Sequence, residues 1–336
     1  MIIFFPTYAH RVSGGWSATI AGMVARPLPE RSRRRTLAVA VLKRLLELDE
    51  AHVSSEVFRA RTESFLFQRV AGQPVGVTLG NRVVEVGPSD RSGHFQHRVT
   101  LDDAFVEAHA THDAGRCRLA YAAIGSDPDT ARPAGGCIHL VDDAGTSVIS
   151  DIDDTVKVTE VANRRELLRN TLVREFRAVP GMAAAYRAWH AAGADFHYVS
   201  ASPWQLSSCL VEFLGTAGLP PGSMHLKIFR LKDSTPLGRL PSRKRSKRRT
   251  IERIMADFPG RRFVLVGDSG ERDPEVYASL ARGRPAQVAA ILIREVPAKA
   301  SRRRVRARLE RLAARLPAGM LRTFVGAEEI VTEVSR

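Results

Sequence analysis

The second half of the chain alternates short apolar runs with amphipathic segments. Apolar runs that predict strands occur at 146–150, 196–200, 225–229, 263–266 and 288–293, and amphipathic runs that predict helices occur at 164–177, 180–192, 204–216, 247–257 and 274–281. Buried strands joined by helices form a parallel sheet that is covered on both faces. The pattern therefore predicts a doubly wound, Rossmann-like α/β domain over residues 141–297. In such domains the active site lies at the carboxyl ends of the strands.

The first part of the chain follows a different rhythm. Short β-rich runs, separated by turn residues, occur at 16–24, 65–70, 75–79, 83–86, 95–101 and 119–124. This spacing is typical of a small β-sandwich. A basic run over 31–50 has a helical pattern, and 125–136 has the composition of a loop. We expect a β-rich N-terminal domain over residues 1–140, of unknown role, and a basic helical tail over 298–336.

Charge and apolar content limit the classes of partner. The chain has 336 residues and a formal net charge of +15, which favours nucleic acid, acidic lipid or phosphorylated substrates, although a solvated basic surface gives the same surplus. No apolar run approaches the ~20 residues that span a bilayer, and the apolar start at 1–6 is too short for a signal peptide. The three cysteines match no zinc spacing. We expect a cytoplasmic protein, at most peripheral on a membrane.

Acidic residues gather where the first strand of the predicted sheet ends. Asp151, Asp153 and Asp154 follow the apolar run at 146–150 directly. Carboxylates this close to one another repel unless a cation or a proton shares their charge. A helix cap would need only one of them. The cluster therefore predicts a cation site at the sheet edge.

Two other strand ends carry polar residues as well. Ser200 and Ser202 end the second strand, where their hydroxyls can cap the next helix or cradle a phosphate. Asp268 follows the strand at 263–266, and Asp273 lies at the start of the helix after it. Because the carboxyl ends of parallel strands meet at one edge, we expect these side chains to lie near the acidic cluster.

These segments, taken together, resemble the motifs of the haloacid dehalogenase superfamily of phosphotransferases. The first motif is similar to Asp151-x-Asp153-x-Thr155, the second to Ser200, the third to a lysine ahead of the helix at 248–255, and the fourth to Gly267-Asp268 with Asp273. More closely, residues 150–155 and 267–277 resemble the catalytic domain of the actin-patch-associated phosphatidate phosphatases. The related lipin phosphatases usually carry Gly at the position of Asp154. Counting back from the helix-ending proline, as in that family, selects Lys247, with Lys244 as the alternative.

The resemblance implies a Mg²⁺-dependent phosphatase that works through an aspartyl-phosphate. Asp151 is the expected nucleophile, and Asp153 is the expected general acid and base. Mg²⁺, which prefers oxygen ligands, would be held by Asp151, the backbone carbonyl of Asp153 and Asp268.

The resemblance also implies how the phosphate is bound. Thr155 and Ser200 would donate hydrogen bonds to its oxygens, and Lys247 would neutralise its charge and keep the nucleophile poised. Asp273 is expected to orient Lys247 or a metal-bound water, and Ser202 to support the site.

The expected substrate is phosphatidate, which such an enzyme converts to diacylglycerol at a membrane surface. Two basic elements could contact an anionic bilayer: a helix at 302–315 with leucines on one side, and the loop at 227–249. One alternative is a phosphatase for soluble or nucleic-acid phosphomonoesters, which the charge permits although aromatic residues make up only 7% of the chain. The other is a non-catalytic phosphatidate-binding module. Such a module is expected to have lost its nucleophile, whereas Asp151 and Asp153 are present.

Overall fold

The computed structural model describes residues 1–29, 31–113, 116–125, 135–161, 163–227, 243–296, 302–331 and 334. These residues form two compact units, of which the first comprises Met1–Asp142 with Gly222–Met224 and the second Asp143–Pro221 with His225–Arg336. The division after Asp142 lies close to the boundary expected at residue 140. Among the described residues, no helix combines the length and the apolar content that a bilayer crossing requires.

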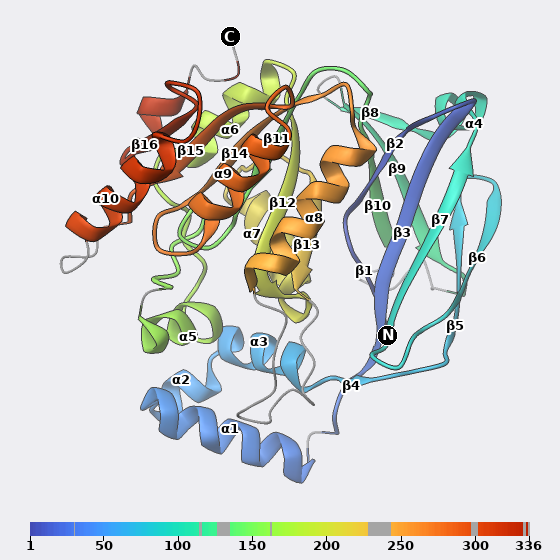
Figure 1. Ribbon diagram of the computed structural model, residues 1–336. Helices are drawn as coiled ribbons and strands as arrows, with labels where there is room; N and C mark the ends of the chain where they lie inside the picture. The colour runs from blue at the N-terminus through green and yellow to red at the C-terminus, as the bar shows by residue number, and fades with distance from the viewer. Residues whose placement is uncertain are drawn as a thin grey trace. The chain divides into compact units, whose positions relative to one another are not determined.

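The first unit is built on a single ten-stranded sheet (Figure 1). Its strands are β1 (Ile2–Phe4), β2 (Thr7–Val12), β3 (Gly15–Arg26), β4 (Gln68–Arg69), β5 (Pro74–Leu79), β6 (Arg82–Pro88), β7 (His94–Leu101), β8 (Thr111–Asp113), β9 (Arg116–Ala123) and β10 (Gly135–Leu140). The main path runs β1-β3-β2-β10-β9-β5-β6, with β4 and β7 also paired to β3 and β8 to β9. The described pairs are antiparallel except β2 with β10.

The expected sandwich is therefore wrong in one respect, because the strands belong to one curled sheet. The cause is the long strand β3, which pairs with β1 and β2 along one edge and with β7 along the other. Alternate side chains of the sheet, such as Ile20, Leu79, Leu119 and Ile138, are fully buried in a common core. The curl lets one sheet enclose that core.

The helices of the first unit are α1 (Arg33–Leu46), α2 (Glu50–Ser54), α3 (Glu56–Leu66) and α4 (Asp103–His109). Helix α1 confirms the helical pattern expected at 31–50. The strand expected at 65–70 is wrong for most of its length, because α3 continues through Leu66 and only Gln68–Arg69 pairs as a strand. Ser55 caps α3 by accepting a hydrogen bond from the Phe58 N–H at 3.2 Å. The end of this helix was predicted as a strand because the residues after Ser64 are apolar and aromatic.

The second unit contains a six-stranded sheet in the order β13-β12-β11-β14-β15-β16. Its strands are β11 (Thr146–Ser150), β12 (Asp195–Pro203), β13 (Ser223–Lys227), β14 (Arg262–Asp268), β15 (Val288–Arg294) and β16 (Leu321–Phe324). The strands from β12 to β16 pair in parallel, which confirms the parallel α/β sheet predicted from the sequence. Strand β16 was not predicted, and it makes the region expected as a tail part of this unit.

The helices of this unit are α5 (Arg164–Leu172), α6 (Met182–Ala191), η1 (Trp204–Leu206), α7 (Ser207–Thr216), α8 (Arg243–Asp257), α9 (Asp273–Gly283), α10 (Arg302–Ala313) and η3 (Ala327–Ile330). Figure 1 shows α8 and α9 on the near face of the sheet and α7 on the far face. After β11, the chain adds β12 and β13 on one edge of β11. Strand β14 then pairs with the opposite edge of β11, so the direction in which strands are added reverses at β11. Ligands bind at such a reversal, outside the carboxyl ends of the two central strands.

At the amino ends of the central strands, opposite the reversal, Arg261 bonds to two neighbouring strands. Its guanidinium is buried and donates to Ser147 Oγ at 2.8 Å, to the Thr146 carbonyl at 2.6 Å and to Asp195 Oδ2 at 2.6 Å. These partners lie on β11 and β12, while Arg261 directly precedes β14. One planar cation therefore sets the spacing of three strands whose far ends carry the candidate site.

We expect Arg261→Met to lower the free energy of unfolding of the second unit by about 3–5 kcal/mol, because it removes the buried cation that pairs with Asp195 and bonds to Ser147 and Thr146. The measurement is urea unfolding followed by circular dichroism. The matched control is Arg262→Met at the exposed neighbouring position, which should change stability by no more than about 0.5 kcal/mol. Equal effects of the two substitutions would contradict this assignment.

Candidate active site

Asp151 lies where β11 ends, at the point of chain reversal. Its N–H donates to the Val266 carbonyl at 2.9 Å, which extends the pairing with β14 by one residue. The side chain is only 1% exposed. Oδ1 accepts a hydrogen bond from Lys247 Nζ at 2.8 Å, whereas Oδ2 is buried and has no hydrogen-bond partner among the described residues. One oxygen of the carboxylate is thus held by a hydrogen bond. The other is open, by which we mean that no described group bonds to it.

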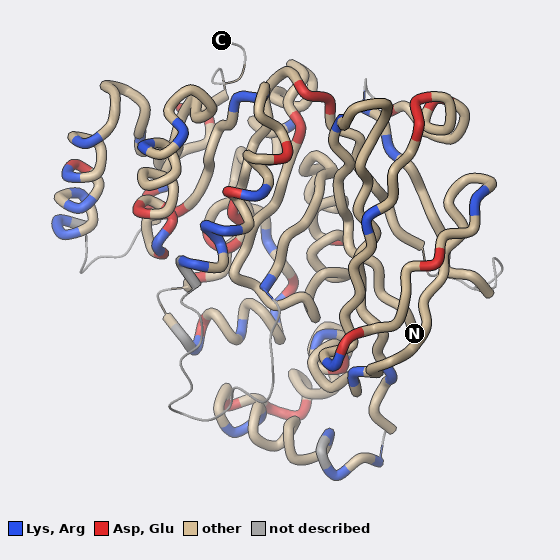
Figure 2. Tube along the Cα trace, turned by 45° about the vertical axis from the view of Figure 1, so that its right-hand side comes forward, with Lys and Arg blue, Asp and Glu red and all other residues tan. Residues whose placement is uncertain are grey.

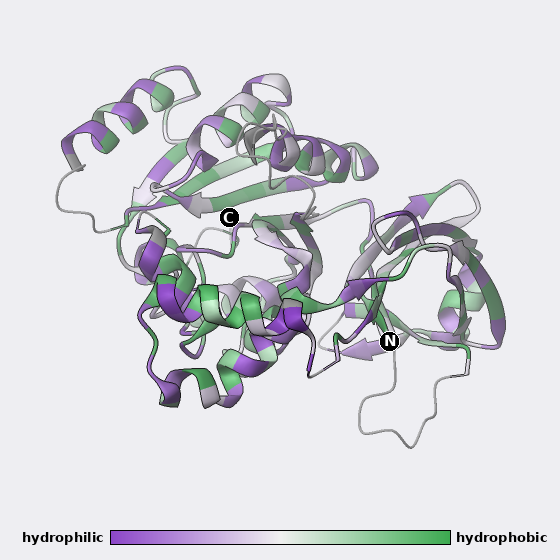
Figure 3. Ribbon diagram, turned by 90° about the horizontal axis from the view of Figure 1, so that it is seen from below, coloured by the Kyte–Doolittle hydropathy of each residue, from purple (hydrophilic) through white to green (hydrophobic). Residues whose placement is uncertain are grey.

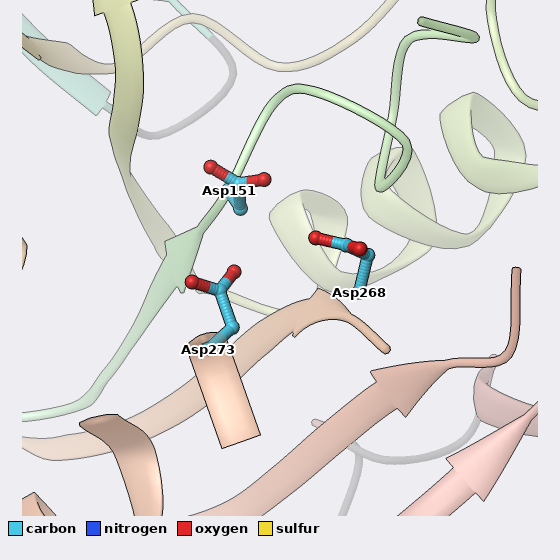
Figure 4. Close-up of side chains that lie close together, drawn as sticks. All are labelled: Asp151, Asp268 and Asp273. Atoms are coloured by element: carbon cyan, nitrogen blue, oxygen red, sulfur yellow. The ribbon is translucent and has the colours of Figure 1, made fainter. Parts of the chain in front are cut away.

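Asp268 and Asp273 complete a cluster of three buried carboxylates (Figure 4). Oxygen atoms of Asp151, Asp268 and Asp273 lie within 4.8 Å of one another. Lys247 Nζ bridges to Asp273 Oδ1 at 2.6 Å, and the Tyr277 hydroxyl lies 3.4 Å from Asp273 Oδ2. Both oxygens of Asp273 are therefore occupied by side chains. Asp268 resembles Asp151, since its Oδ2 is buried and no group in the described part of the chain bonds to it.

Gly267 explains how the carboxylates come so close. A Cβ atom at this position would lie 2.4 Å from Asp273 Oδ2 and 2.9 Å from a ring carbon of Tyr277. Only a residue without a side chain fits between β14 and the start of α9 here. The Gly-Asp pair in the sequence motif is thus a packing requirement of the site.

The cluster has more carboxylates than cations to compensate them. Three carboxylates facing the single ammonium group of Lys247 leave two negative charges in excess if all are ionised. Burial, together with the charges of Asp273 and Glu271, raises the pKa of Asp268 to about 8. Burial also raises the pKa of Asp151, an effect that Lys247 opposes. A divalent cation between the open oxygens of Asp151 and Asp268 would relieve this repulsion, and oxygen ligands suit Mg²⁺.

Asp153 belongs to a second group of contacts. Its Oδ1 accepts from Lys157 Nζ and from Thr159 Oγ1, both at 2.8 Å. Its Oδ2 accepts from Ser200 Oγ at 3.1 Å and Ser202 Oγ at 2.7 Å. The two serines at the end of β12 thus contact the carboxylate that follows β11, which brings two of the predicted strand ends together.

These contacts determine the protonation of Asp153. Burial alone would raise the pKa of this carboxyl group, but the charge and hydrogen bond of Lys157, with the hydroxyl donors, lower the pKa below its ordinary value. Lys157 is itself buried and also lies 4.7 Å from the centre of the Phe176 ring. Asp153 is therefore an ionised carboxylate in the arrangement described here.

Asp154 has a structural function in the same loop. Its backbone has a positive φ of 55°. The side chain accepts hydrogen bonds from the N–H groups of Thr159, Glu160 and Val161 at 2.7–2.8 Å. Asp tolerates this left-handed conformation better than most residues with side chains. The carboxylate therefore holds the loop that carries the other acidic residues, and its charge is compensated by three backbone amides.

A pocket of about 180 Å³ opens beside the cluster. Lys247 and Asp273 line it together with the apolar side chains Val161, Ala201 and Val276. The buried ion pair thus has an access route whose walls are partly apolar. Thr155, which was expected to contact phosphate, is buried, and its hydroxyl has no hydrogen-bond partner among the described residues.

The structure joins the predicted site residues into two neighbouring groups at the carboxyl ends of β11, β12 and β14, to which α8 contributes Lys247 and α9 contributes Asp273. The first group contains Asp151, Lys247, Asp268 and Asp273, and the second contains Asp153, Ser200 and Ser202. The side chain of Lys244, the alternative lysine, lies outside the described residues. Sequence reasoning missed Lys157, Thr159 and Tyr277. A lysine inside the apolar run after Asp154 was the available signal, because a buried lysine requires an acidic partner.

In the presence of a chelator, we expect the free energy of unfolding to fall as the pH rises from about 5 to 8, with a slope of up to ~1.4 kcal/mol per pH unit for one group. Asp268 has a raised pKa in the folded state. The native protein therefore retains a proton that the unfolded chain releases at lower pH, and this stabilisation is lost as the pH approaches 8.

The measurement is a series of urea titrations across this pH range, for wild type and for Asp268→Asn. The asparagine cannot titrate, so the variant should show a flatter dependence of stability on pH. An unchanged slope in the variant would rule out Asp268 as the group responsible.

Part of the chain is similar in sequence to known proteins. Residues 146–295 match the family model described as "Phosphatidate phosphatase APP1, catalytic domain". Phosphatidate phosphatase APP1 of Saccharomyces cerevisiae is 31% identical over 261 residues, which cover 71% of this chain and 40% of the yeast protein. An uncharacterized protein of Schizosaccharomyces pombe is 35% identical over 163 residues, which cover 47% of this chain and 26% of that protein. The chain thus spans less than half the length of either relative.

The match over 146–295 includes every candidate site residue from Asp151 to Asp273. A solved carbohydrate esterase aligns with 11% identity and a TM-score of 0.23, which is too low to support any inference. Residues 146–295, which contain strands β11, β12, β13, β14 and β15 and the acidic cluster, belong to the family of the APP1-type phosphatidate phosphatase catalytic domain.

Proposed function

We propose that the second unit is a Mg²⁺-dependent phosphatase that converts phosphatidate to diacylglycerol through an aspartyl-phosphate. The observation that carries the proposal is the carboxylate of Asp151, with one oxygen held by Lys247 and the other buried and open. The order of the parallel strands and the position of Asp151 at their reversal support a haloacid-dehalogenase-like Rossmann fold. The choice of phosphatidate rests on the name of the yeast relative.

In the first step, one carboxylate oxygen of Asp151 attacks the phosphorus in line with the leaving oxygen, and the other oxygen stays available to the metal ion. The new O–P bond forms and the bond from phosphorus to the diacylglycerol oxygen breaks, with the proton for that oxygen supplied by Asp153. Lys247 holds Oδ1 and places a positive charge beside the phosphate oxygens, which stabilises the charge that develops in the transition state. Asp273 positions Lys247 through the 2.6 Å contact.

In the second step, water attacks the phosphorus and regenerates Asp151. Asp153 accepts a proton from this water, and its ionised state in the present arrangement suits a base. The same group must supply a proton to the leaving oxygen in the first step, which requires it to be protonated before attack. Its contact with Lys157 opposes that protonation, so we expect this contact to weaken when substrate binds.

Asp151 and Asp268 are the side chains suited to hold Mg²⁺, because each has an open buried oxygen. The backbone carbonyl of Asp153 remains the expected third protein ligand. When bound, the ion would neutralise charge on the phosphate and on the acidic cluster. Thr155, with its unpartnered hydroxyl, is available to bind a phosphate oxygen. Ser200 can do so only if it releases Asp153.

We expect Asp151→Asn to reduce phosphate release from phosphatidate by at least about 1,000-fold, because the amide oxygen is a poor nucleophile. The measurement is phosphate release from mixed micelles of detergent and phosphatidate with Mg²⁺. The matched control is Asp143→Asn at an exposed position of the same unit, which should retain full activity. If wild type hydrolyses soluble phosphomonoesters and leaves phosphatidate untouched, the lipid assignment is wrong.

A chelator should abolish the same activity, and added Mg²⁺ should restore it. Asp268→Asn removes one open oxygen, so we expect the Mg²⁺ concentration for half-maximal activity to rise at least about tenfold. Asp273→Asn should change the Mg²⁺ requirement less, because both oxygens of Asp273 already have side-chain partners. Full activity of the wild type in excess chelator would contradict the metal assignment.

A further inference from the structure

Helix α1 of the first unit exposes a stripe of large apolar side chains. Leu37, Val41 and Leu45 are 67%, 55% and 56% exposed. Residues four apart lie one above the other on a helix, so the three side chains form one continuous row. An exposed apolar residue that stands alone, such as Val83 on β6, is ordinary on a protein surface, whereas a contiguous row on a helix indicates a binding surface.

The row does not stabilise the described fold, because α1 is held by its other side. Leu46 is fully buried there. Arg35 donates to Glu63 Oε1 of α3 at 2.8 Å, and Lys43 forms an ion pair with Glu50 of α2. The helix therefore needs no further partner to remain in place. The face that carries Leu37, Val41 and Leu45 is available for a ligand.

The charged residues of α1 itself are all positive. Helix α1 contains no acidic residue. Arg33 and Arg44 lie on the same exposed side of the helix as the apolar row, and no ion pair involves either of them within the described part of the chain. Figure 2 shows the basic segments near the two ends of α1, and Figure 3, seen from below, shows its apolar middle between polar ends. The surface thus combines an apolar row with unpaired cations.

Helix α10 provides an informative contrast. It is rich in arginine, but its apolar side is already used, since Leu309 is only 3% exposed and the helix packs against α9 and β16. The basic loop at 228–242 lies outside the described residues. Of α1 and α10, only α1 combines cations with a row of exposed large apolar side chains. This combination is the requirement for lying in the plane of a membrane interface.

We propose that α1 binds the surface of an anionic lipid bilayer. Leu37, Val41 and Leu45 enter the boundary of the acyl chains, and Arg33 and Arg44 contact the headgroups. A second copy of the chain fits this surface less well, because pairing two copies of α1 would bring only like charges together. The choice of a lipid partner rests on the proposed function, since phosphatidate is presented at a membrane.

The test is binding of the full chain to phosphatidylcholine vesicles with and without phosphatidylglycerol, measured by co-sedimentation. Phosphatidylglycerol is anionic but offers no phosphomonoester, so binding is measured without turnover. We expect binding to the anionic vesicles that falls with added salt. The combined substitutions Leu37→Ser, Val41→Ser and Leu45→Ser should weaken this binding at least about tenfold. Arg33→Gln with Arg44→Gln should remove most of its salt dependence.

The matched control is Val83→Ser, which removes an equally exposed apolar side chain elsewhere in the same unit and should leave binding unchanged. The triple variant should keep wild-type hydrolysis of a soluble phosphomonoester and lose hydrolysis of phosphatidate in vesicles. Failure of the proposed function would instead appear as no hydrolysis of any phosphomonoester by wild type, whatever the vesicle binding. Wild-type vesicle binding by the triple variant would overturn the proposal. If that variant binds vesicles normally but forms fewer dimers than wild type, the row is instead a contact between two copies of the chain.

Discussion

The second unit depends on one buried interaction, the ammonium group of Lys247 between the carboxylates of Asp151 and Asp273. Burial alone would lower the pKa of this lysine, but the two carboxylates raise it well above its ordinary value. The pair of contacts connects α8 to the ends of β11 and the start of α9. Without the lysine, the carboxylates would face one another in a site with little water, which is strongly destabilising.

The acidic cluster after β11 can exist because each member is compensated differently. Asp151 has Lys247, Asp153 has Lys157, and Asp154 has three backbone amides. The three aspartates are chemically alike, and their different partners give each of them a different role. Asp151 keeps an open oxygen, Asp153 is held ionised, and Asp154 stabilises the loop. The positive φ of Asp154 also gives a physical reason why a glycine can occupy this position in related enzymes.

The basic helices α1 and α10 differ in how they pack. Helices α1 and α10 both carry arginines, yet α10 uses its apolar side to cover the parallel sheet and α1 leaves an apolar row free. A positive charge by itself therefore does not identify a membrane-binding helix. The apolar area that remains after folding decides between a solvated basic surface and an interfacial one.

Local patterns in the sequence were enough to predict most of the strands and helices between residues 146 and 294 and the acidic residues that follow the strands. The helix expected at 164–177 ends at Leu172, and the segment expected as a loop at 227–249 is already helical from Arg243. The local patterns were otherwise sufficient because strand and helix periodicity, and the rule that parallel strands present their carboxyl ends at one edge, depend on neighbouring residues. The patterns failed where a contact overrode them. Strand β16 exists because it pairs with β15, and α3 extends over a run with strand-like composition.

The partners of the acidic residues were decided by the tertiary structure. Lys247 reaches Asp151 across 96 residues of sequence, and only the family spacing selected it, with Lys244 as the alternative, from the other cations of its basic run. Lys157 lies only four residues from Asp153, but its pairing follows from burial in a loop that has no regular period. The sequence alone therefore determined which carboxylates stand at the sheet edge. Only the three-dimensional packing decided which cation neutralises each one and which oxygens remain open, because both depend on distances between segments that are remote in the chain.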